Sequence, residues 1–402
     1  MIRGCGTITH MIIRKAFVYR IYPTLTQIAA LDTVLWRARE LYNACLEERI
    51  EAHRHGASVN RYSQQRQLPG IKKVRSEYAL LNSQMLQDVV YRVDRAFQGL
   101  FRRKKAGLKG GFPRFRGRDR YDSFTLTQTG WKVAENRLVL TGVGPLKVRW
   151  SRPIEGAIKT VTIRRDAGAW FVSFSCVVEV AAPTPNPALP AVGIDVGLEY
   201  FATLSDGTHL ANPRHLRVSQ AALTRRQQAL ARKKRGSRRR KKARLLVAKA
   251  HRKIRNQRKN FHHQTARVLV RGHSLIVVET LQIANLVRRR APILGVTADE
   301  GTLVYLPNGA AAKAGLNLSI HDAGWGQFLA ILRAKAEEAG CVLVAVNPAG
   351  TSQMCSGCGA RRPKDLSARW HTCTGCGCSL QRDVNAARNT LARAGQALQG
   401  GT

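Results

Sequence analysis

Apolar residues in the first 110 positions follow the spacing of one strand and two amphipathic helices. In residues 12–24, IIRKAFVYRIYPT, apolar and polar side chains alternate as they do in a half-buried strand. From Thr26 to Gly56, apolar residues recur every three or four positions, which predicts one long helix that stops at the glycine. The same spacing in residues 83–105 predicts a second helix. Four cations close this helix, and they both suit the negative end of a helix dipole and begin a basic stretch.

Shorter apolar runs between residues 124 and 180 have the alternation of β-strands. Turn residues separate these runs at Glu135-Asn136 and again at Asp166-Ala167-Gly168. We therefore expect a small β-barrel in this part of the chain. It ends at the segment AAPTPNPALP, residues 181–190, whose four prolines predict a linker and the clearest domain boundary in the sequence.

Three apolar strands alternate with helices after the linker. The first, AVGIDV, contains Asp195, the second, SLIVVE, ends at Glu279, and the third is CVLVAVNP at residues 341–348. The Gly- and Ala-rich residues 287–317 are expected to form an irregular exposed loop, with helix signals resuming at Asp322. Strands that alternate with helices and end in lone acids are typical of an RNase H-like α/β core.

Three acids are the candidate catalytic residues: Asp195, Glu279 and Asp383, which starts the last helix. An acid within an apolar strand is unfavourable unless it binds a cation or takes part in chemistry. Carboxylate oxygens suit Mg²⁺ or Mn²⁺, and two such ions can activate water and stabilise the leaving 3′ oxygen of a phosphodiester. Asp195 would then contact both ions, with Glu279 and Asp383 each completing one shell. The alternatives are a surface ion pair and, for Asp383, a simple helix cap.

Two Cys-x-x-Cys pairs near the C-terminus predict a zinc ribbon. Their members are Cys355, Cys358, Cys373 and Cys376. Each pair directs two sulfurs to one centre, and four thiolates complete the tetrahedral shell that Zn²⁺ prefers. His371 and Cys378 are near enough in sequence to act as substitute ligands, although the spacing favours the four cysteines. A closed four-thiolate site has no open position for substrate, so the zinc is expected to be structural.

The charge of the chain indicates a polyanionic partner. Of 402 residues, 67 are Lys or Arg and 25 are Asp or Glu, so the net charge is +42 and the isoelectric point is near 11.1. No acid occurs from Gly207 to Ser274, and 18 of the 35 residues from Arg225 to Lys259 are basic. Ordinary solvated helices mix charges of both signs, whereas an unmixed basic surface is typical of contact with a phosphate backbone. Nucleic acid is therefore the expected partner.

Membrane lipid, the competing polyanion, is disfavoured by the sequence. No apolar run approaches about 18 residues, and the N-terminus lacks the pattern of a signal peptide. Nine cysteines, five of them outside the ribbon spacing, fit a reducing compartment better than a disulfide framework. These features predict a cytoplasmic protein. The chain is expected to be globular, because 44% of its residues are hydrophobic and can fill the cores of two or three domains.

Two basic stretches supply the candidate contacts to nucleic acid. In residues 107–124, GLKGGFPRFRGRDRYDSF, aromatic residues alternate with cations, a mixture that suits base stacking and phosphate binding. A solvated loop is the alternative for this stretch. The second stretch lies in basic helices expected at residues 219–270. The candidate residues are Arg114, Arg116 and Arg118 in the first stretch, and Arg232, Lys233, Lys234, Arg235, Arg238, Arg239 and Arg240 in the second.

Several segments of the chain resemble one protein family. The motifs GIDVGLEYFATLSDG, VVETLQIANL, HDAGWGQF, TSQMCSGCG with CTGCG, and RDVNAARN occur in this order. Together with RKAFVYRIYPT and GFPRFRGR they resemble the TnpB (OrfB) proteins of bacterial insertion sequences, relatives of the type V CRISPR nucleases, over residues 12–395. The resemblance implies an RNA-guided DNA endonuclease that cuts motif-flanked double-stranded DNA. It also implies a guide RNA from the transposon end and a RuvC-like site at Asp195, Glu279 and Asp383.

The resemblance further implies an order of domains. A helical recognition domain splits a β-barrel wedge domain, and a zinc ribbon interrupts a RuvC-like nuclease core, so the fold class is multidomain α+β. Residues 1–10 show no pattern, and Met11 is an alternative start. The expected segments are the first part of the wedge barrel at 1–26, the recognition domain at 27–110, the rest of the barrel at 111–182, a linker at 183–190, the nuclease core at 191–350, the ribbon at 351–380, and the last nuclease helix with a tail at 381–402.

By their position in the family pattern, four residues are candidates for reading the motif in duplex DNA. They are Tyr62, Gln84, Gln87 and Thr125. Pairing with a guide would read the rest of the target, so few side chains need to read bases. Side-chain amides pair with adenine edges in the major groove, although either glutamine would serve equally as a solvated helix residue.

An active RNA-guided nuclease, monomeric within a ribonucleoprotein and working at the bacterial nucleoid, is the function that the sequence favours. A nuclease-inactive RNA-guided repressor is the first alternative, but missing acids would favour it, and all three acids are present. A plain nucleic-acid-binding protein leaves the buried acids unexplained. A recombinase is disfavoured because nothing resembles a tyrosine or serine nucleophile motif, and a type V CRISPR-like effector remains a further alternative.

Overall fold

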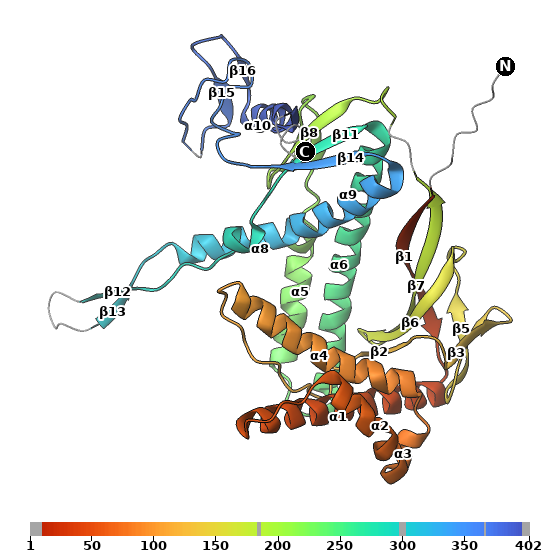
Figure 1. The fold of residues 1–402 in the computed structure, drawn as a ribbon. Helices are drawn as coiled ribbons and strands as arrows, with labels where there is room; N and C mark the ends of the chain where they lie inside the picture. Colours follow the sequence, from red (N-terminus) through yellow and green to blue (C-terminus); the bar gives the residue numbers. More distant parts are fainter. Residues whose placement is uncertain (1–9, 183–185, 297–302, 366, 396–402) are drawn as a thin grey trace, which may run out of the picture. The chain divides into compact units, whose positions relative to one another are not determined.

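The computed structural model describes residues 10–182, 186–296, 303–365 and 367–395, which divide into two compact units. Unit 1 ends at Ala181 and unit 2 begins at Ala182, at the start of the proline-rich segment. Figure 1 shows the elements of both units. Residues 1–9 and the last residues of the tail lie outside the described residues, so the expectations for them stay predictions. No described helix is both long and apolar enough to span a bilayer.

A seven-stranded antiparallel sheet forms the frame of unit 1, in the order β2-β6-β7-β1-β5-β4-β3. Strand β1, from the start of the chain, pairs with β7 along its length and with β5 at its end, so it lies inside a sheet made from residues 123–181. The strands are β1 (His10–Tyr22), β2 (Ser123–Leu126), β3 (Trp131–Ala134), β4 (Arg137–Leu140), β5 (Gly144–Arg149), β6 (Ala157–Asp166) and β7 (Ala169–Ala181).

The expected turns of this sheet are confirmed by positive backbone angles. Glu135 and Asn136, between β3 and β4, have φ values of 47° and 61°, and Ala167 and Gly168, between β6 and β7, have values of 46° and 75°. Two successive residues with positive φ are the geometry of tight hairpin turns whose twist matches that of the flanking strands. The turn residues therefore determine the register of both hairpins.

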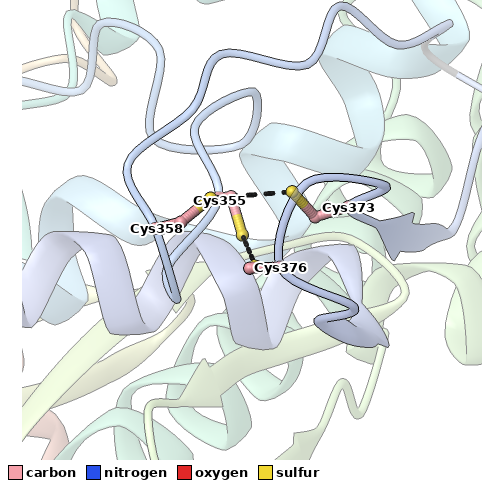
Figure 2. A group of neighbouring side chains, drawn as sticks. All are labelled: Cys355, Cys358, Cys373 and Cys376. Carbon is pink, nitrogen blue, oxygen red and sulfur yellow. Dashed lines mark hydrogen bonds between the residues drawn. The ribbon is translucent and has the colours of Figure 1, made fainter.

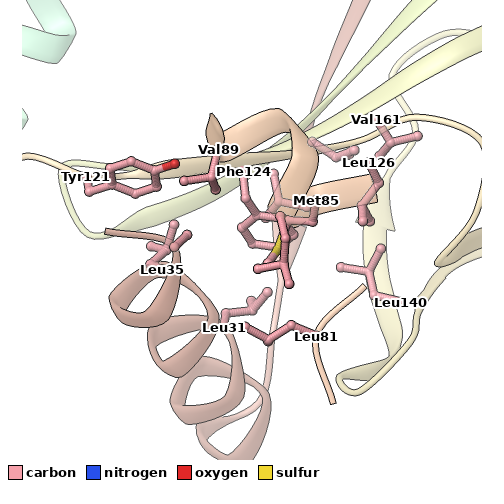
Figure 3. Packing of buried hydrophobic residues seen from close by; sticks show 14 of the residues in the cluster. Leu31, Leu35, Leu81, Met85, Val89, Tyr121, Phe124, Leu126, Leu140 and Val161 are labelled. Carbon is pink, nitrogen blue, oxygen red and sulfur yellow. The ribbon is translucent and has the colours of Figure 1, made fainter. Parts of the chain in front are cut away.

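The expected small β-barrel is, in the structure, an open but curled sheet. Strands β2 and β3 form the two edges of the sheet and do not pair with each other. The sheet is nevertheless strongly curled, because the rings of Trp131 on β3 and Phe174 on β7 are 6.4 Å apart between centroids. In a flat sheet these strands, four positions apart, would be separated by about 19 Å. The apolar face of the sheet is covered by helices. Leu31 of α1 (Leu25–Arg54) and Met85 of α4 (Ser83–Lys105) pack against Phe124 on this face (Figure 3).

Four helices lie between β1 and β2 in the chain: α1 (Leu25–Arg54), α2 (Arg61–Val74), α3 (Ser76–Ala79) and α4 (Ser83–Lys105). The two helices expected from apolar spacing, α1 and α4, are confirmed. Helix α2 was not expected, because it buries only Gln64 and Leu68 and has no apolar stripe. Hydrogen bonds, in place of an apolar stripe, hold the buried Gln64 side chain. Its amide donates to the Cys45 carbonyl at 2.8 Å and accepts from Arg49 Nε at 2.8 Å.

A five-stranded sheet in the order β10-β9-β8-β11-β14 forms the centre of unit 2. Strands β8, β11 and β14 are parallel to one another, whereas β9 runs antiparallel to β8 and the edge strand β10 runs antiparallel to β9. The three apolar strands expected after the linker are β8, β11 and β14. The bounds are β8 (Ala191–Val196), β9 (Tyr200–Leu204), β10 (His209–Ala211), β11 (Leu275–Glu279) and β14 (Val342–Val346).

Helices α6 and α9 cover one face of this sheet. Phe201 on β9 contacts Phe261 of α6 and Phe328 of α9, with ring centroids 4.8 Å and 4.9 Å apart. Apolar residues of β8 and β11 complete this core. The helices of unit 2 are α5 (His215–Ala231), α6 (Arg238–Gly272), α7 (Ile283–Leu286), α8 (Ala310–Ala323), α9 (Trp325–Ala339) and α10 (Arg382–Ala392).

Those of residues 287–317 that the structure describes are largely exposed, as expected, but they are only partly irregular. Strand β12 (Ile293–Val296) pairs antiparallel with β13 (Leu303–Leu306), and the first part of α8 follows. The Ala-rich run after Gly309 is helical, because alanine is the strongest helix former. Helix α8 also begins well before Asp322, and Gly324, with φ of 67°, separates it from α9.

Candidate active site

Parallel pairing brings two of the three acids to the same edge of the unit 2 sheet. Val278 of β11 lies opposite Ile194 of β8, so the next residues, Glu279 and Asp195, are also neighbours. Both acids therefore sit near the carboxyl ends of adjacent parallel strands. Because side chains alternate along a strand and Ile194 is buried in the core beneath α6 and α9, Asp195 points to the other face.

Helix α10 packs on that other face and brings the third acid, Asp383. A glycine makes the close packing possible. A methyl group added to Gly193 of β8 would lie 2.8 Å from the backbone nitrogen of Leu391 and closer still to the carbonyl oxygen of Ala387. Gly193 and Asp195 share one face of the strand, so the glycine sets how near α10 lies to the catalytic candidate.

We expect Gly193→Ala to destabilise unit 2 by about 1–3 kcal/mol, because the methyl group overlaps the backbone of α10. Gly315→Ala is the matched control, since a methyl group at this exposed position of α8 meets no atom within 4 Å. The control should be neutral or stabilising by up to about 1 kcal/mol. Urea unfolding of both variants measures the difference, and equal stability of the two would contradict the close approach.

The three carboxylates line one cavity of about 440 Å³, which we call the carboxylate pocket. They come from three different elements, β8, β11 and α10. Two arginines also reach the pocket: Arg382, whose Nε lies 3.7 Å from Asp383 Oδ1, and Arg369, which pairs with Glu199 at 3.5 Å. The remaining lining residues are Val196, Gly197, Leu198, Glu199, Pro348, Thr351, Ser352 and Ala386.

The charge in the carboxylate pocket is incompletely balanced. Burial raises the pKa of the Asp195 carboxyl well above its ordinary value, and the nearby charges of Glu279 and Asp383 raise it further. Burial also raises the pKa of Glu279, while a hydrogen bond from Thr351 acts in the opposite direction. Carboxylates that oppose each other's ionisation are stabilised by a bound cation.

Asp383 is not the helix cap that was considered as an alternative. The N-cap of α10 is Gln381, which makes no side-chain capping bond, and Asp383 lies in the first turn of the helix. There its charge is favoured by the positive end of the helix dipole. The structure thus leaves Asp383 available to the pocket.

The carboxylate pocket fits a divalent metal by its donor set and its charge. Oxygen ligands and excess negative charge suit Mg²⁺ or Mn²⁺. The acids are more widely spread than the ribbon thiols, however, because among the described residues only the four cysteines converge within 4.8 Å. A wider spread is compatible with two ions, which lie about 3.5–4 Å apart in two-metal sites.

The four cysteines of the expected ribbon do come together, as Figure 2 shows. Cys355 Sγ lies 3.6 Å from Cys376 Sγ, and Cys358 Sγ lies 3.6 Å from Cys373 Sγ. The backbone N–H of Cys376 and the guanidinium of Arg362 lower the pKa of the Cys373 thiol to about 6. A thiol that ionises easily is suited to metal binding, which requires the thiolate. We call this group the cysteine cluster; it could hold Zn²⁺.

Neither substitute ligand is one of the four converging residues, although the Cys378 thiol interacts with that of Cys355. His371, on β15 (Trp370–Thr372), is fully buried, and its Nδ1 contacts Lys364 Nζ. Cys378 precedes β16 (Ser379–Gln381), and its carbonyl accepts the backbone N–H of Cys373. The antiparallel pair β15–β16 leads directly into α10, so the cluster is folded next to the helix that carries Asp383.

The candidate motif readers of unit 1 differ in how free their side chains are. Gln84 Oε1 accepts hydrogen bonds from Thr127 Oγ1 at 2.7 Å and from the backbone N–H groups of Gln128 and Thr129. This oxygen is therefore occupied in holding the connection between β2 and β3. A contact to adenine through two hydrogen bonds would need the same oxygen. Gln87 is exposed on the same helix, which leaves its amide free for such a contact.

The other two candidates also have neighbours. Tyr62 is exposed, and its ring lies 4.6 Å from the guanidinium of Arg61. The Thr125 hydroxyl accepts from Arg92 Nη2 at 2.9 Å and lies 3.1 Å from the Thr162 hydroxyl, so it is largely occupied within unit 1. Base reading by the four residues stays a prediction.

Arg114, Arg116 and Arg118 lie in an exposed segment between α4 and β2. The segment is anchored to α1, because Asn43 exchanges two hydrogen bonds with the backbone of Arg116, at 2.7 Å and 3.1 Å. The Arg116 guanidinium lies 5.4 Å from the ring centroid of Tyr42. These contacts hold the backbone in place while the three cationic side chains face solvent.

The second basic stretch spans the end of α5 and the start of α6. Six of its seven candidates are exposed: Arg232, Lys233, Lys234, Arg235, Arg238 and Arg239. Arg240 is different, because its Nη1 donates to the carbonyl oxygens of Leu230 and Lys233 at 3.1 Å and 2.8 Å. A cation that binds the last carbonyls of a helix stabilises its C-terminus, so Arg240 has a structural role at the end of α5.

Sequence reasoning missed Thr351 and Arg382 in the carboxylate pocket. Thr351 is 4% exposed and donates from Oγ1 to Glu279 Oε1 at 2.7 Å. A lone threonine between a strand and a Cys-x-x-Cys pair has no distinctive spacing. Arg382 precedes a candidate acid in the sequence, and this adjacency was the one signal that could have drawn attention to it.

Three family models match this chain. One described as "Probable transposase", the OrfB model of IS605 elements, matches residues 173–290, and one described as "Cas12f1-like, TNB domain" matches residues 325–390. A third, described as "Helix-turn-helix domain", matches residues 11–58. The structure has one strand and one long helix in these last residues, β1 and α1, so the description does not fit the fold of this segment.

Two curated relatives match over most of their length. The chain is 35% identical over 371 residues to a Streptomyces pristinaespiralis protein named "Putative RNA-guided DNA endonuclease", covering 88% of this chain and 82% of that protein. It is 32% identical over 349 residues to "Putative RNA-guided DNA endonuclease InsQ" of Escherichia coli strain K12, covering 86% and 83%. Among solved structures, the mini RNA-guided endonuclease CRISPR-Cas phi3 matches with a TM-score of 0.45 and 11% identity, covering 95% of this chain and 92% of that one.

Proposed function

Because this chain belongs to the TnpB (OrfB) family of insertion-sequence proteins, we propose that it is an RNA-guided DNA endonuclease that hydrolyses phosphodiester bonds at the carboxylate pocket. Both relatives that match over most of their length are named as endonucleases of this kind. The observation that supports the proposal best is the convergence of Asp195, Glu279 and Asp383 on one cavity from three separate elements.

The strand order of unit 2 supports an RNase H-like, RuvC-type nuclease core. Three antiparallel strands, β10-β9-β8, continue into two strands that are parallel to β8. In open sheets of this kind, functional residues gather at the carboxyl ends of the parallel strands. Asp195 and Glu279 occupy those positions here, and α10 adds Asp383 from the face that packs on β8.

We assign the catalytic roles to the residues of the pocket. Mg²⁺ bound to the three carboxylates would activate water and polarise the scissile phosphate. Asp195, Glu279 and Asp383 would hold a pair of such ions as carboxylates, and their partial burial strengthens this attraction by lowering the local dielectric. Arg369 and Arg382 line the same pocket and are placed to bind phosphate oxygens of the DNA strand.

Guide RNA and target DNA account for the charge of the chain. The proposed protein binds a guide RNA from the transposon end and a double-stranded target next to a short motif, as a monomer in a ribonucleoprotein. Its exposed cations around Arg116 and along α5 and α6 would contact phosphates, while the guide reads the target sequence. The cysteine cluster, with Zn²⁺ bound, would stabilise the fold beside α10.

Cleavage by the purified ribonucleoprotein tests the proposed function. The protein is expressed with the RNA of its own element, and a plasmid library with random bases beside one target is added with Mg²⁺. We expect cleavage that depends on Mg²⁺ and on one short motif. Specific binding without cleavage would instead support the nuclease-inactive repressor, and guide RNA supplied by a CRISPR array would indicate the type V effector.

A further inference from the structure

Two buried asparagines of α10 hold the segment that leads from β14 to the first cysteine pair. The Asn389 amide donates to the carbonyl oxygens of Thr351 at 2.8 Å and Met354 at 2.7 Å. The Asn385 amide donates to the same Met354 oxygen at 2.7 Å, and its oxygen accepts the backbone N–H of Ser356 at 2.9 Å. The two asparagines are one helical turn apart, and the exposed fraction is 0% for Asn385 and 8% for Asn389. The segment is thus fixed to α10 at three backbone positions.

One end of this segment touches a catalytic candidate. The Thr351 hydroxyl lies 2.7 Å from Glu279 Oε1 and 3.0 Å from the carbonyl oxygen of Pro348. A hydroxyl has a single proton to donate, and an ionised carboxylate is the stronger acceptor. The contact therefore fixes the orientation of the Glu279 carboxylate within the carboxylate pocket.

The other end of the segment belongs to the cysteine cluster. Cys355 lies between Met354 and Ser356, the residues that the asparagines hold, and it is 1% exposed. Its sulfur lies 3.6 Å from that of Cys376 in the second pair. The same two asparagines therefore position a member of the cysteine cluster and the hydroxyl that contacts Glu279.

Buried hydrogen bonds of this kind resist distortion. In a low-dielectric interior each bond is electrostatically stronger than in water, and a carbonyl group that loses its partner stays desolvated and unpaired. Helix α10 also carries Asp383, so two catalytic candidates and the cysteine cluster are attached to one helix.

From these contacts we propose that Thr351 is a positioning residue for Glu279. The cysteine cluster, through Asn385 and Asn389, determines where Thr351 lies. This inference rests on the proposed function, in that it assigns Glu279 to the metal-binding carboxylates. The cysteine cluster then has a second role beside folding: its occupancy by metal adjusts how well the carboxylate pocket binds a divalent cation. Partners that orient metal ligands in this way change metal affinity by about 10–100-fold when they are removed.

The test measures Mn²⁺ affinity by electron paramagnetic resonance in the full chain with its co-purified RNA. The Asp195→Asn variant defines the signal that belongs to the carboxylate pocket. Thr351→Val removes the hydroxyl at nearly constant volume and should weaken this Mn²⁺ site at least about tenfold. Thr351→Ser keeps the hydroxyl and should restore affinity to within a few-fold. Should the valine variant fail to fold, Thr351→Ala gives the same comparison without the branched side chain.

The second arm tests the link to the cysteine cluster. Cys358→Ser, on the exposed side of the cluster, should weaken the same Mn²⁺ site by a similar factor. Unchanged Mn²⁺ affinity in Thr351→Val overturns the positioning role, and unchanged affinity in Cys358→Ser overturns the coupling. A wild-type protein that binds Mn²⁺ through Asp195 but cuts no DNA would refute the proposed function alone, because both affinity comparisons remain decisive.

Discussion

Replacing Asp195 with asparagine is expected to abolish DNA cleavage while making the metal-free protein more stable. The Asp195 carboxylate lines the same pocket as Glu279 and Asp383, and its loss removes charge that a divalent cation needs. Several kcal/mol of transition-state stabilisation correspond to a fall in rate of about 10³-fold or more. The same charge is unfavourable in the metal-free state, because Glu279 and Asp383 lie close enough to oppose it. One substitution should therefore move activity and stability in opposite directions.

The pH dependence of stability tests the electrostatic part of this prediction separately. Since the pKa of Asp195 is raised in the folded state, the folded protein binds this proton more tightly than the unfolded chain does. The contribution of Asp195 to the free energy of unfolding is therefore greatest below the ordinary carboxyl pKa of about 4. It falls as pH rises from there toward the raised pKa of Asp195 in the folded protein. Thermal unfolding without added Mg²⁺ or Mn²⁺, and without a chelator that would remove the zinc, should show a smaller loss of stability across this window in Asp195→Asn than in wild type.

Asp206→Asn is the matched control for both measurements. Asp206 is an exposed acid in the turn between β9 and β10, and its Oδ1 accepts the backbone N–H of Thr208 at 2.8 Å, a bond that asparagine can keep. Cleavage and unfolding temperature of this variant should match wild type. Residual Mg²⁺-dependent cleavage by Asp195→Asn near the wild-type rate would remove Asp195 from the active site.

The second large effect is expected for Cys373→Ser, which should lose zinc and unfold the ribbon. Binding of structural zinc contributes about 10–16 kcal/mol in isolated zinc fingers, and this energy is folding energy. The Cys376 backbone N–H and Arg362 lower the pKa of the Cys373 thiol to about 6, and Cys373 is buried. Cleavage should fall to background, because the ribbon leads directly into α10.

Zinc content and limited proteolysis measure this effect. We expect wild type to retain zinc through gel filtration and Cys373→Ser to lose it, with new cleavage sites confined to the residues between β14 and α10. Cys378→Ser is the control, because Cys378 lies in the same ribbon but is not one of the four cysteines whose sulfurs converge. If the control loses zinc as completely as Cys373→Ser, the assignment of the four ligands is wrong.

The parts of the fold that sequence predicted are those where local chemistry determines geometry. The Glu135-Asn136 and Ala167-Gly168 turns were found because few residues adopt positive φ. Helix α4 was found because its apolar stripe is wide. Helix α2 was missed because a buried polar network around Gln64 replaces such a stripe. Strand spacing predicts a small β-barrel but not whether its edges pair, because closure depends on pairing between distant strands, which periodicity does not report.

The candidate site shows the same division. Asp195 and Glu279 stand out because an acid interrupts or ends an apolar run, and the cysteines stand out by spacing. Thr351 could not be found in this way, since its role comes from a hydrogen bond to a residue far away in sequence. Gly193 was equally hidden, because only the packing of α10 shows why a side chain is excluded there.

The packing of α10 on Gly193 also sets when the protein can first act during its synthesis. Strands β8 and β11 leave the ribosome well before α10, which supplies Asp383 and covers β8. At about 5–20 residues per second, the roughly 100 residues between Glu279 and α10 take about 5–20 s to translate. During this interval the nascent chain has two of its three carboxylates and an uncovered face on β8. A nuclease built in this order stays inactive until translation has passed the ribbon.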